Sequence, residues 1–241
     1  MLYKYLILAA FTLLVSACGG QKATPQNSAE KYFQEGEKFF DSQLYEDAIA
    51  SWEKARDSYY SAALNMLAEL KIAEAYYLSE RYEEAAAAYD YFLKRHPNDP
   101  RIDDVLYRLG LSHYQQILSA DRDQTSTRNA LKVFEELLRR YPEYPQAQEA
   151  NLLIQRCRNR LAEHEIYVGH YYLKQELYQA AIKRLESLLQ QYPDYYYRDE
   201  AFFYLWQAYR ETGEMDKSQA AYQQLSEQFP GSEYMNKVQE L

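Results

Sequence analysis

Apolar residues recur along most of the chain at intervals of three and four positions, which is the period of an amphipathic helix. Several segments also share one pattern of positions, which we call the frame. In the frame a small residue is followed three positions later by a bulky one, and the residues on both sides are compatible with a helix. The first small residue of four successive segments is Gly36, Ala73, Gly110 or Gly169. A fifth segment keeps only the bulky positions of the frame. The pattern therefore predicts five helix pairs of the tetratricopeptide (TPR) type, each with a helix A and a helix B.

Each position in the frame has a physical role. The first small residue lets helix A approach helix B closely, and the bulky residue one turn later fills the space beside it. A second small residue does the same on helix B, and we expect the bulky residue four positions further on to dock between pairs. These second small residues are Ala48, Ala85, Ala130 and Ala181.

Turns and prolines give the predicted helix ends. Short polar stretches such as 41–43, 79–81, 174–176 and 212–214 separate helix A from helix B. Because proline lacks an N–H and disfavours the helical region for the residue before it, it should end helix B. The four prolines in this position are Pro97, Pro142, Pro193 and Pro230.

Two segments depart from the repeat. Residues 119–129 form a polar insert inside the third pair, where Ser126 or Thr127 is expected to cap the following helix. Residues 146–165 add a second helical stretch, which predicts one elongated helix joining repeats three and four. The predicted fold is all-α, a TPR superhelix of five helix pairs with an elongated helix in repeat four. Its predicted parts are an N-terminal half (29–120), a loop insert (121–129) and a C-terminal half (130–241).

The N-terminus has the pattern of a bacterial lipoprotein. Residues 1–17 carry one lysine and then an apolar run too short to span a bilayer, which predicts a signal peptide. Cys18 follows small residues and is the predicted lipidation site, as an N-palmitoyl, S-diacylglycerol cysteine. Gly20 stands where lipoprotein families carry an aspartate for inner-membrane retention, so this resemblance implies the outer membrane. Residues 18–28 are expected to form a flexible tether. The alternative is an ordinary secretory signal with an incidental cysteine.

Composition narrows the function. Only 7 Gly and 7 Pro occur, against 27 Tyr, which fits a helical array whose packing positions are aromatic. The formal net charge is −9, so we expect neither nucleic acid nor an anionic lipid surface as a partner. The four histidines form no metal-binding pair, and no phosphate loop or nucleophile motif is present. We therefore predict no catalytic residue, no metal and no cofactor. We expect His113 to be a packing residue and Cys157 to be a buried apolar one.

The A helices of the first two repeats offer a candidate binding surface. In a TPR superhelix the concave wall is lined by helix A residues that point away from helix B. Apolar and aromatic residues at such positions suit an extended, partly apolar peptide. Packing between repeats would explain them equally well. The residues that the frame places in this predicted substrate-peptide groove are Phe33, Glu37, Phe40, Leu67, Leu70, Glu74, Tyr77 and Leu78.

The order of these features resembles the BamD family, the TPR lipoproteins of the β-barrel assembly machinery. The resemblance rests on the lipoprotein signal, the tether, five repeats, the insert with Asp121-Arg122-Asp123 and the elongated helix with Arg160-Leu161-Ala162-Glu163. The stretch His96-Pro97 to Gly110-Leu111 is also similar to that family. The likeness covers essentially the whole chain after residue 17.

This resemblance implies an outer-membrane, periplasm-facing scaffold without enzymatic activity. The N-terminal repeats would meet unfolded outer-membrane β-barrel proteins. The C-terminal repeats would hold a POTRA domain of BamA, beside other lipoproteins of the machinery. The residues that the resemblance assigns to BamA binding are Arg198 and Asp199, with the preceding Tyr196 and Tyr197. The alternatives are a different periplasmic TPR lipoprotein adaptor, serving envelope, division or peptidoglycan machinery, and an enzyme subunit.

Overall fold

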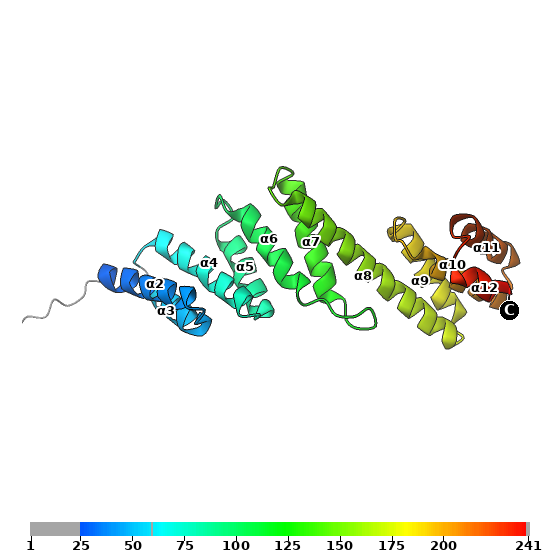
Figure 1. The fold of residues 1–241 in the computed structure, drawn as a ribbon, viewed down its shortest axis with the longest axis horizontal. Coiled ribbons are helices and arrows are strands. Elements are labelled where there is room, and N and C mark those ends of the chain that lie inside the picture. The colour runs from blue at the N-terminus through cyan, green and yellow to red at the C-terminus, as the bar shows by residue number, and fades with distance from the viewer. Residues whose placement is uncertain (1–24, 59, 240–241) are drawn as a thin grey trace, which may run out of the picture. The chain divides into compact units, whose positions relative to one another are not determined.

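The computed structural model describes residues 25–58 and 60–239, and within them the regular secondary structure is helical (Figure 1). The predicted signal peptide (1–17) and Cys18 lie outside the described residues. The helices are α2 (Pro25–Asp41), α3 (Tyr45–Asp57), α4 (Ala62–Leu78), α5 (Tyr82–Arg95), α6 (Ile102–Tyr114), α7 (Thr125–Arg140), α8 (Ala147–Lys174), α9 (Tyr178–Gln191), α10 (Arg198–Glu211), α11 (Met215–Gln228) and α12 (Glu233–Gln239). The predicted all-α TPR fold with five helix pairs is confirmed, and α12 follows the fifth pair.

By its internal contacts the chain forms two compact units. Unit 1 comprises residues 1–75, and unit 2 comprises residues 76–241. The boundary falls inside α4, between Ala75 and Tyr76. The predicted halves 29–120 and 130–241 do not coincide with these units.

Close approach within a helix pair explains the glycines of the frame. A Cβ atom added at Gly36 would lie 2.5 Å from Trp52 Nε1, and one added at Gly110 would lie 2.5 Å from Phe134 Cε1. At Gly169 it would lie 2.8 Å from the Leu185 side chain. The predicted close approach is therefore confirmed at these three positions. The expectation that the bulky helix B residue docks between pairs was incomplete, because it fills the space against the glycine of its own pair.

The turns from helix A to helix B share one hydrogen-bond arrangement in four of the pairs. A residue in the left-handed region occurs in each turn, at Gln43, Glu80, Glu176 and Gly213, with φ between 59° and 76°. The next residue donates its N–H to the carbonyl five positions earlier, as in Leu44 N to Phe39 O at 2.9 Å. This is the Schellman arrangement, which satisfies carbonyls at the end of helix A. The predicted turns are confirmed.

The prolines act as predicted. Helices α5, α7, α9 and α11 each end two residues before a proline, and the intervening residue has φ between −126° and −135°. This extended backbone is what a following proline imposes.

The elongated helix is confirmed as α8, with 28 residues. It belongs to two cores of unit 2. Its first half, with Leu153 and Cys157, packs against α6 and α7 around Phe134. Its second half, with Ile166, packs against α9, α10 and α11 around Leu185. Because α8 is long enough to contribute to both cores, it joins them (Figure 1).

Two helices begin earlier than the sequence suggested. Helix α2 begins at Pro25, within the predicted tether 18–28, because proline is well suited to the first position of a helix. Helix α7 begins at Thr125, within the predicted insert 121–129. Ser126 and Thr127 are therefore inside α7 and do not cap it. Instead Asp123 Oδ1 accepts the N–H of Thr125 at 2.8 Å, and this hydrogen bond lowers the pKa of Asp123.

The loop before α7 is organised by a buried glutamine that the sequence analysis did not single out. Gln124 is 1% exposed. Its Nε2 donates to the carbonyls of Ser119 and Arg122 at 2.8 and 3.0 Å, while its Oε1 accepts from Thr127 Oγ1 at 2.8 Å. His164 Nδ1 lies 2.6 Å from the Ala120 carbonyl, which fixes the loop to α8. Hydrogen bonds of Gln124 and His164 therefore fix the conformation of this loop.

Candidate functional site

Three of the predicted groove residues, Glu37, Phe40 and Glu74, meet around a lysine of unit 1. Lys71 Nζ lies 3.7 Å from Glu37 Oε1 and 3.6 Å from Glu74 Oε2, so α2 and α4 each supply one carboxylate. The ammonium also lies 5.1 Å from the ring centroid of Phe40 and 5.9 Å from that of Trp52. We call Lys71, Glu37, Glu74, Phe40 and Trp52 the Lys71 cluster.

The aromatic residues of this surface are half-buried. The ring of Phe40 lies 5.4 Å from that of Trp52, and the ring of Phe33 lies 6.3 Å from it. Leu70 is half-buried as well, whereas Leu67 is 36% exposed. Phe33 and Phe40 therefore pack against Trp52 and still reach the surface. Both interpretations of the sequence, a packing role and a place in a binding surface, are compatible with these two residues.

Two polar atoms of the cluster have no hydrogen-bond partner. They are Glu37 Oε1, which faces Lys71 only at ion-pair distance, and Trp52 Nε1. Buried polar atoms are normally paired, because an unpaired one loses its hydration without compensation. The cluster thus holds an acceptor and a donor that a ligand could satisfy after a small side-chain movement.

The remaining groove residues, Tyr77 and Leu78, belong to unit 2. The Tyr77 hydroxyl accepts a hydrogen bond from Gln115 Nε2 at 3.4 Å, and its ring lies 5.4 Å from that of Tyr82. Leu78 is 44% exposed. Sequence reasoning missed Lys71, although its position three residues before Glu74 gives a helical ion-pair spacing that could have indicated it.

The residues predicted to bind BamA surround the start of α10. Tyr196 and Tyr197 are 78% and 58% exposed, and their rings meet edge to face at 5.0 Å. The Arg198 guanidinium lies 5.8 Å from the Phe229 ring centroid, and its Nε is buried without a hydrogen-bond partner. We call Tyr196, Tyr197 and Arg198 the tyrosine–arginine cluster.

Asp199 has a different role from its neighbour. Its Oδ2 accepts a hydrogen bond from Ser232 Oγ at 2.6 Å, in the segment that leads into α12. Helix α12 packs against α10 and brings the Tyr234 ring 5.2 Å from that of Phe203. Asp199 therefore holds the C-terminal segment against α10. This hydrogen bond uses one of the two carboxylate oxygens of Asp199.

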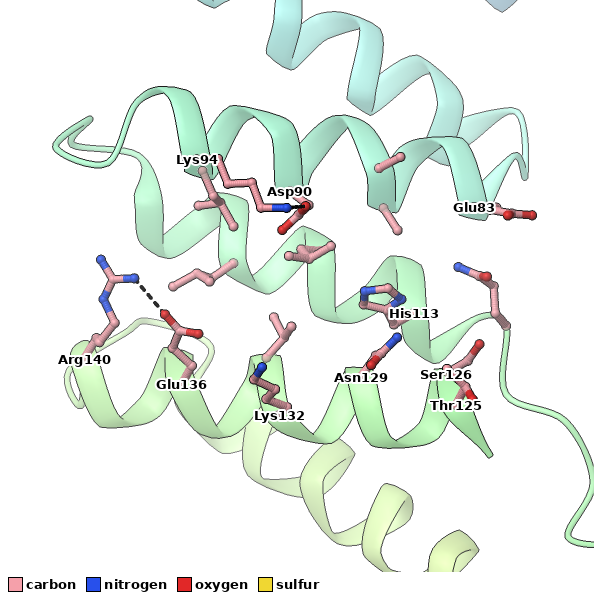
Figure 2. A pocket seen from close by; sticks show the side chains of 17 residues that line it. Glu83, Asp90, Lys94, His113, Thr125, Ser126, Asn129, Lys132, Glu136 and Arg140 are labelled. Carbon is pink, nitrogen blue, oxygen red and sulfur yellow. Dashed lines mark hydrogen bonds and ion pairs between the residues drawn. The ribbon is translucent and has the colours of Figure 1, made fainter. Parts of the chain in front are cut away.

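Unit 2 also contains a cleft of about 730 Å³ between α5, α6 and α7, lined by both charged and aliphatic side chains. Figure 2 shows its charged walls, where Lys94 lies next to Asp90 and Arg140 next to Glu136. His113, which the sequence assigned to packing, is half-buried in one wall, and burial lowers its pKa. The two ion pairs neutralise four of the charged side chains of the cleft, so those four offer little to a charged ligand.

Two smaller clefts, each of about 460 Å³, open on the long helix α8. One lies between α6 and α8, and the other lies between α8 and α10. Each is lined by two Lys or Arg residues and by at least one aromatic residue, together with one carboxylate, which is Glu163 in the first cleft and Glu211 in the second.

The described residues show no group of three or more His, Cys, Asp or Glu that could hold a metal ion. Cys157 is fully buried, and burial raises the pKa of its thiol to about 12, so the predicted apolar role is confirmed. Across the part of the chain that the structure describes, no helix combines the length and apolar character needed to cross a membrane.

A family model described as an outer membrane lipoprotein, YfiO, matches residues 25–225. The match spans most of the chain, from the start of α2 into α11. The chain belongs to this family. Together with the similarity to BamD relatives, the match confirms the BamD-family resemblance of the sequence.

Relatives named "Outer membrane protein assembly factor BamD" are similar over most of their length. The protein from Neisseria meningitidis serogroup A is 27% identical over 249 residues, covering 96% of this chain and 93% of the relative. The protein from Vibrio cholerae is 29% identical over 197 residues, covering 78% and 82%. Among solved structures, the TPR2AB domain of yeast Sti1 aligns over 84% of this chain and 78% of that chain, with 15% identity and a TM-score of 0.43.

Proposed function

We propose that this protein is a scaffold of the machinery that assembles outer-membrane β-barrel proteins, anchored to the outer membrane on its periplasmic face. The observation that carries the proposal is the match to BamD assembly factors over 96% of the chain. The described residues add two partly exposed surfaces and no constellation of catalytic groups, which favours a binding role over an enzymatic one. The net charge of −9 disfavours nucleic acid.

The first part of the proposal places unfolded outer-membrane proteins on the Lys71 cluster. The half-buried Phe33 and Phe40 offer apolar contact, while Lys71, Glu37 and Trp52 offer polar groups for a peptide backbone or carboxylate. An aromatic surface with a few fixed polar groups suits an extended, partly apolar segment. Leu67, Leu70 and Glu74 on α4 extend this surface.

Peptide binding tests this part. The probe is a fluorescent synthetic peptide with the C-terminal sequence of a β-barrel protein from the same organism, titrated in fluorescence anisotropy. We expect Phe40→Ala and Lys71→Met each to weaken binding about tenfold, in line with interface hot spots. Lys31→Met is the matched control, because the Lys31 side chain is 72% exposed and pairs with Glu35 on its own helix. Equal weakening by Lys71→Met and Lys31→Met would contradict the site.

The fluorescence of Trp52 gives a second measurement of peptide binding in the same experiment. The chain has two tryptophans, and Trp52 lies within the Lys71 cluster. In a Trp206→Phe background, peptide binding should change the Trp52 emission. Saturable binding without any change in that emission would place the peptide elsewhere.

The second part of the proposal places a POTRA domain of BamA on the tyrosine–arginine cluster. Arg198 has an unpaired Nε, and an arginine of this kind pairs well with a partner carboxylate. Tyr196 and Tyr197 supply exposed aromatic area beside it. Asp199 contributes by holding the C-terminal segment in place.

Co-purification with the BamA POTRA region tests this part. Arg198→Ala and Tyr196→Ala should reduce the retained POTRA protein, whereas the exposed Arg139→Ala should not. Asp199→Ala should weaken POTRA binding and also speed hydrogen exchange in α12, because it removes the acceptor for Ser232. No association of the parent chain with POTRA domains would refute this assignment.

The third part concerns the anchor. Cys18→Ser should move the protein from the outer-membrane fraction to the soluble periplasmic fraction, because the acyl chains supply the membrane affinity. Mass spectrometry of the N-terminal peptide should show a lipid-modified Cys18 in the parent. An unmodified cysteine, or an uncleaved N-terminus, would contradict lipidation.

A further inference from the structure

The solvent-facing side of α8 carries a stripe of cationic and tyrosine residues that is interrupted by one carboxylate, Glu163. Its spacing of three and four positions puts all the members on one helix face. The rise of 1.5 Å per residue makes the stripe about 27 Å long. We call these residues the α8 stripe: Arg156, Arg160, Glu163, Tyr167, Tyr171 and Lys174.

Each end of the stripe opens into a cleft. At one end Arg156 and Arg160 line the cleft between α6 and α8, together with Tyr114 and Ile117. At the other end Lys174 lines the cleft between α8 and α10, beside Trp206 and Arg210. The Arg210 guanidinium lies 4.8 Å from the Trp206 ring centroid.

The cations of these two clefts are largely unpaired. Within the described residues Arg156, Lys174 and Arg210 make no ion pair, whereas Arg160 pairs with Glu163 at 2.7 Å. The chain as a whole carries a net charge of −9, so a cationic surface is a local exception. Because exposed charges interact over only about 8 Å at physiological salt, this local surplus decides what binds here.

The middle of the stripe is aromatic. Tyr167 and Tyr171 are 49% and 53% exposed, on a helix that buries Leu161, Ala162 and Ile166 on its other sides. Tyrosine and arginine are the residues that dominate binding energy in protein interfaces, since they combine apolar area with hydrogen bonding. The stripe therefore has apolar contact area in its middle and positive charge at both ends.

We infer that the α8 stripe is a second docking surface, which binds an extended acidic segment of a partner protein. Carboxylates at the two ends of the segment would enter the clefts, and apolar side chains between them would lie on Tyr167 and Tyr171. An extended segment of about eight residues spans the required 27 Å at about 3.3 Å per residue. This surface shares no residue with the Lys71 cluster or with the tyrosine–arginine cluster, so its test uses variants of other residues.

Peptide titration on the full-length protein tests the inference. The probe is a fluorescent ten-residue peptide with two glutamates at each end and leucine and phenylalanine in the middle. The comparison peptide has glutamine in place of every glutamate. We expect saturable binding of the glutamate peptide, at least about tenfold tighter than that of the glutamine peptide.

Charge reversal locates the site. Arg156→Glu combined with Lys174→Glu should weaken binding of the glutamate peptide about tenfold or more. The matched control combines Lys132→Glu with Lys183→Glu, on exposed faces of α7 and α9. Each substitution changes the charge by −2, so both double variants go from −9 to −13 and differ only in position. The control should change binding less than about twofold.

Aromatic truncation separates the stripe from general electrostatics. Tyr171→Ser should weaken binding, whereas Tyr91→Ser, at a tyrosine 50% exposed on α5, should not. Trp206 emission and circular dichroism confirm that each variant is folded.

Three results would overturn the inference. The first is absence of saturable binding of the glutamate peptide. The second is an equal loss in the stripe variant and its matched control. The third is self-association of the parent chain in sedimentation that Arg156→Glu with Lys174→Glu abolishes, because the occupant would then be a second copy of this chain.

Discussion

Gly110 is the position where the close approach of two helices can be tested most directly. An alanine there would place its Cβ 2.5 Å from Phe134 Cε1 and 2.8 Å from Cδ1 and Cζ of the same ring. Phe134 is fully buried, and its ring lies 6.1 Å from that of Tyr107, so it has no free space to enter. Gly110→Ala must therefore displace the ring or separate α6 from α7.

The magnitude follows from two opposing effects. Exchange of glycine for alanine within a helix favours folding by about 1 kcal/mol. Overpacking of a filled core costs about 1–3 kcal/mol, and three ring atoms closer than 3 Å place this site at the upper end. We expect a net loss of about 2 kcal/mol in the free energy of unfolding. For a unit of this size the midpoint temperature should fall by about 4–8 °C.

The two tryptophans make the measurement specific to one unit. Trp52 lies in unit 1, and Trp206 lies in unit 2 with Gly110. In a Trp52→Phe background, the emission of Trp206 during urea denaturation reports on unit 2 alone. Gly231→Ala is the control, because an added Cβ there meets no atom within 4 Å.

A second substitution checks the cause. Phe134→Leu should relieve the clash, so the double variant should be more stable than the sum of the single effects predicts, by about 1 kcal/mol or more. A Gly110→Ala variant as stable as its parent would refute the reasoning. So would strict additivity with Phe134→Leu.

Three further predictions concern backbone strain, acid stability and thiol reactivity. Gly213→Ala should lower the free energy of unfolding by about 1 kcal/mol in the same urea assay through strain alone, because Gly213 has φ +76° and an added Cβ has no neighbour within 4 Å. Side-chain hydrogen bonds from Arg101 lower the pKa of Asp99 to about 2, so the Asp99 carboxylate stabilises the fold above about pH 4 and loses that effect as the pH falls toward 2. Asp99→Asn should therefore be less stable than the parent at pH 7, and urea midpoints should converge at low pH; a constant difference would contradict the assignment. Cys157 should react with a thiol reagent at pH 8 at least about 100-fold more slowly in the native chain than after unfolding, and fast native labelling would show that the helix face is open.

Much of the fold was predictable because its signals are local. The small residue of the first four repeats, the proline after four of the B helices and the turn after a helix A act within a few positions of the chain. Gly36, Pro97 and Gly213 therefore carry their meaning in the sequence. The elongated helix α8 was predictable for the same reason, since its apolar residues keep helical spacing throughout. The BamD-family membership followed from the order of these local features.

The starts of α2 and α7 were less predictable. Polar residues are compatible with a loop or with the first turn of a helix, and only the surrounding contacts decide between them. At α7 the deciding contacts are the hydrogen bonds of Asp123 and of the buried Gln124. Both residues are polar, and nothing in their spacing distinguishes them from other loop residues.

The sequence by itself determined that the chain is a TPR array, where its helices pair and which faces are apolar. Only the tertiary structure decided which charged groups meet. Lys71 joins carboxylates from two helices, Asp199 fastens the segment before α12, and α8 places Arg156 and Lys174 at two separate clefts. Helical periodicity reports whether a face is buried, but it does not report which distant side chain lies opposite, because that contact depends on how packed helices are placed in space.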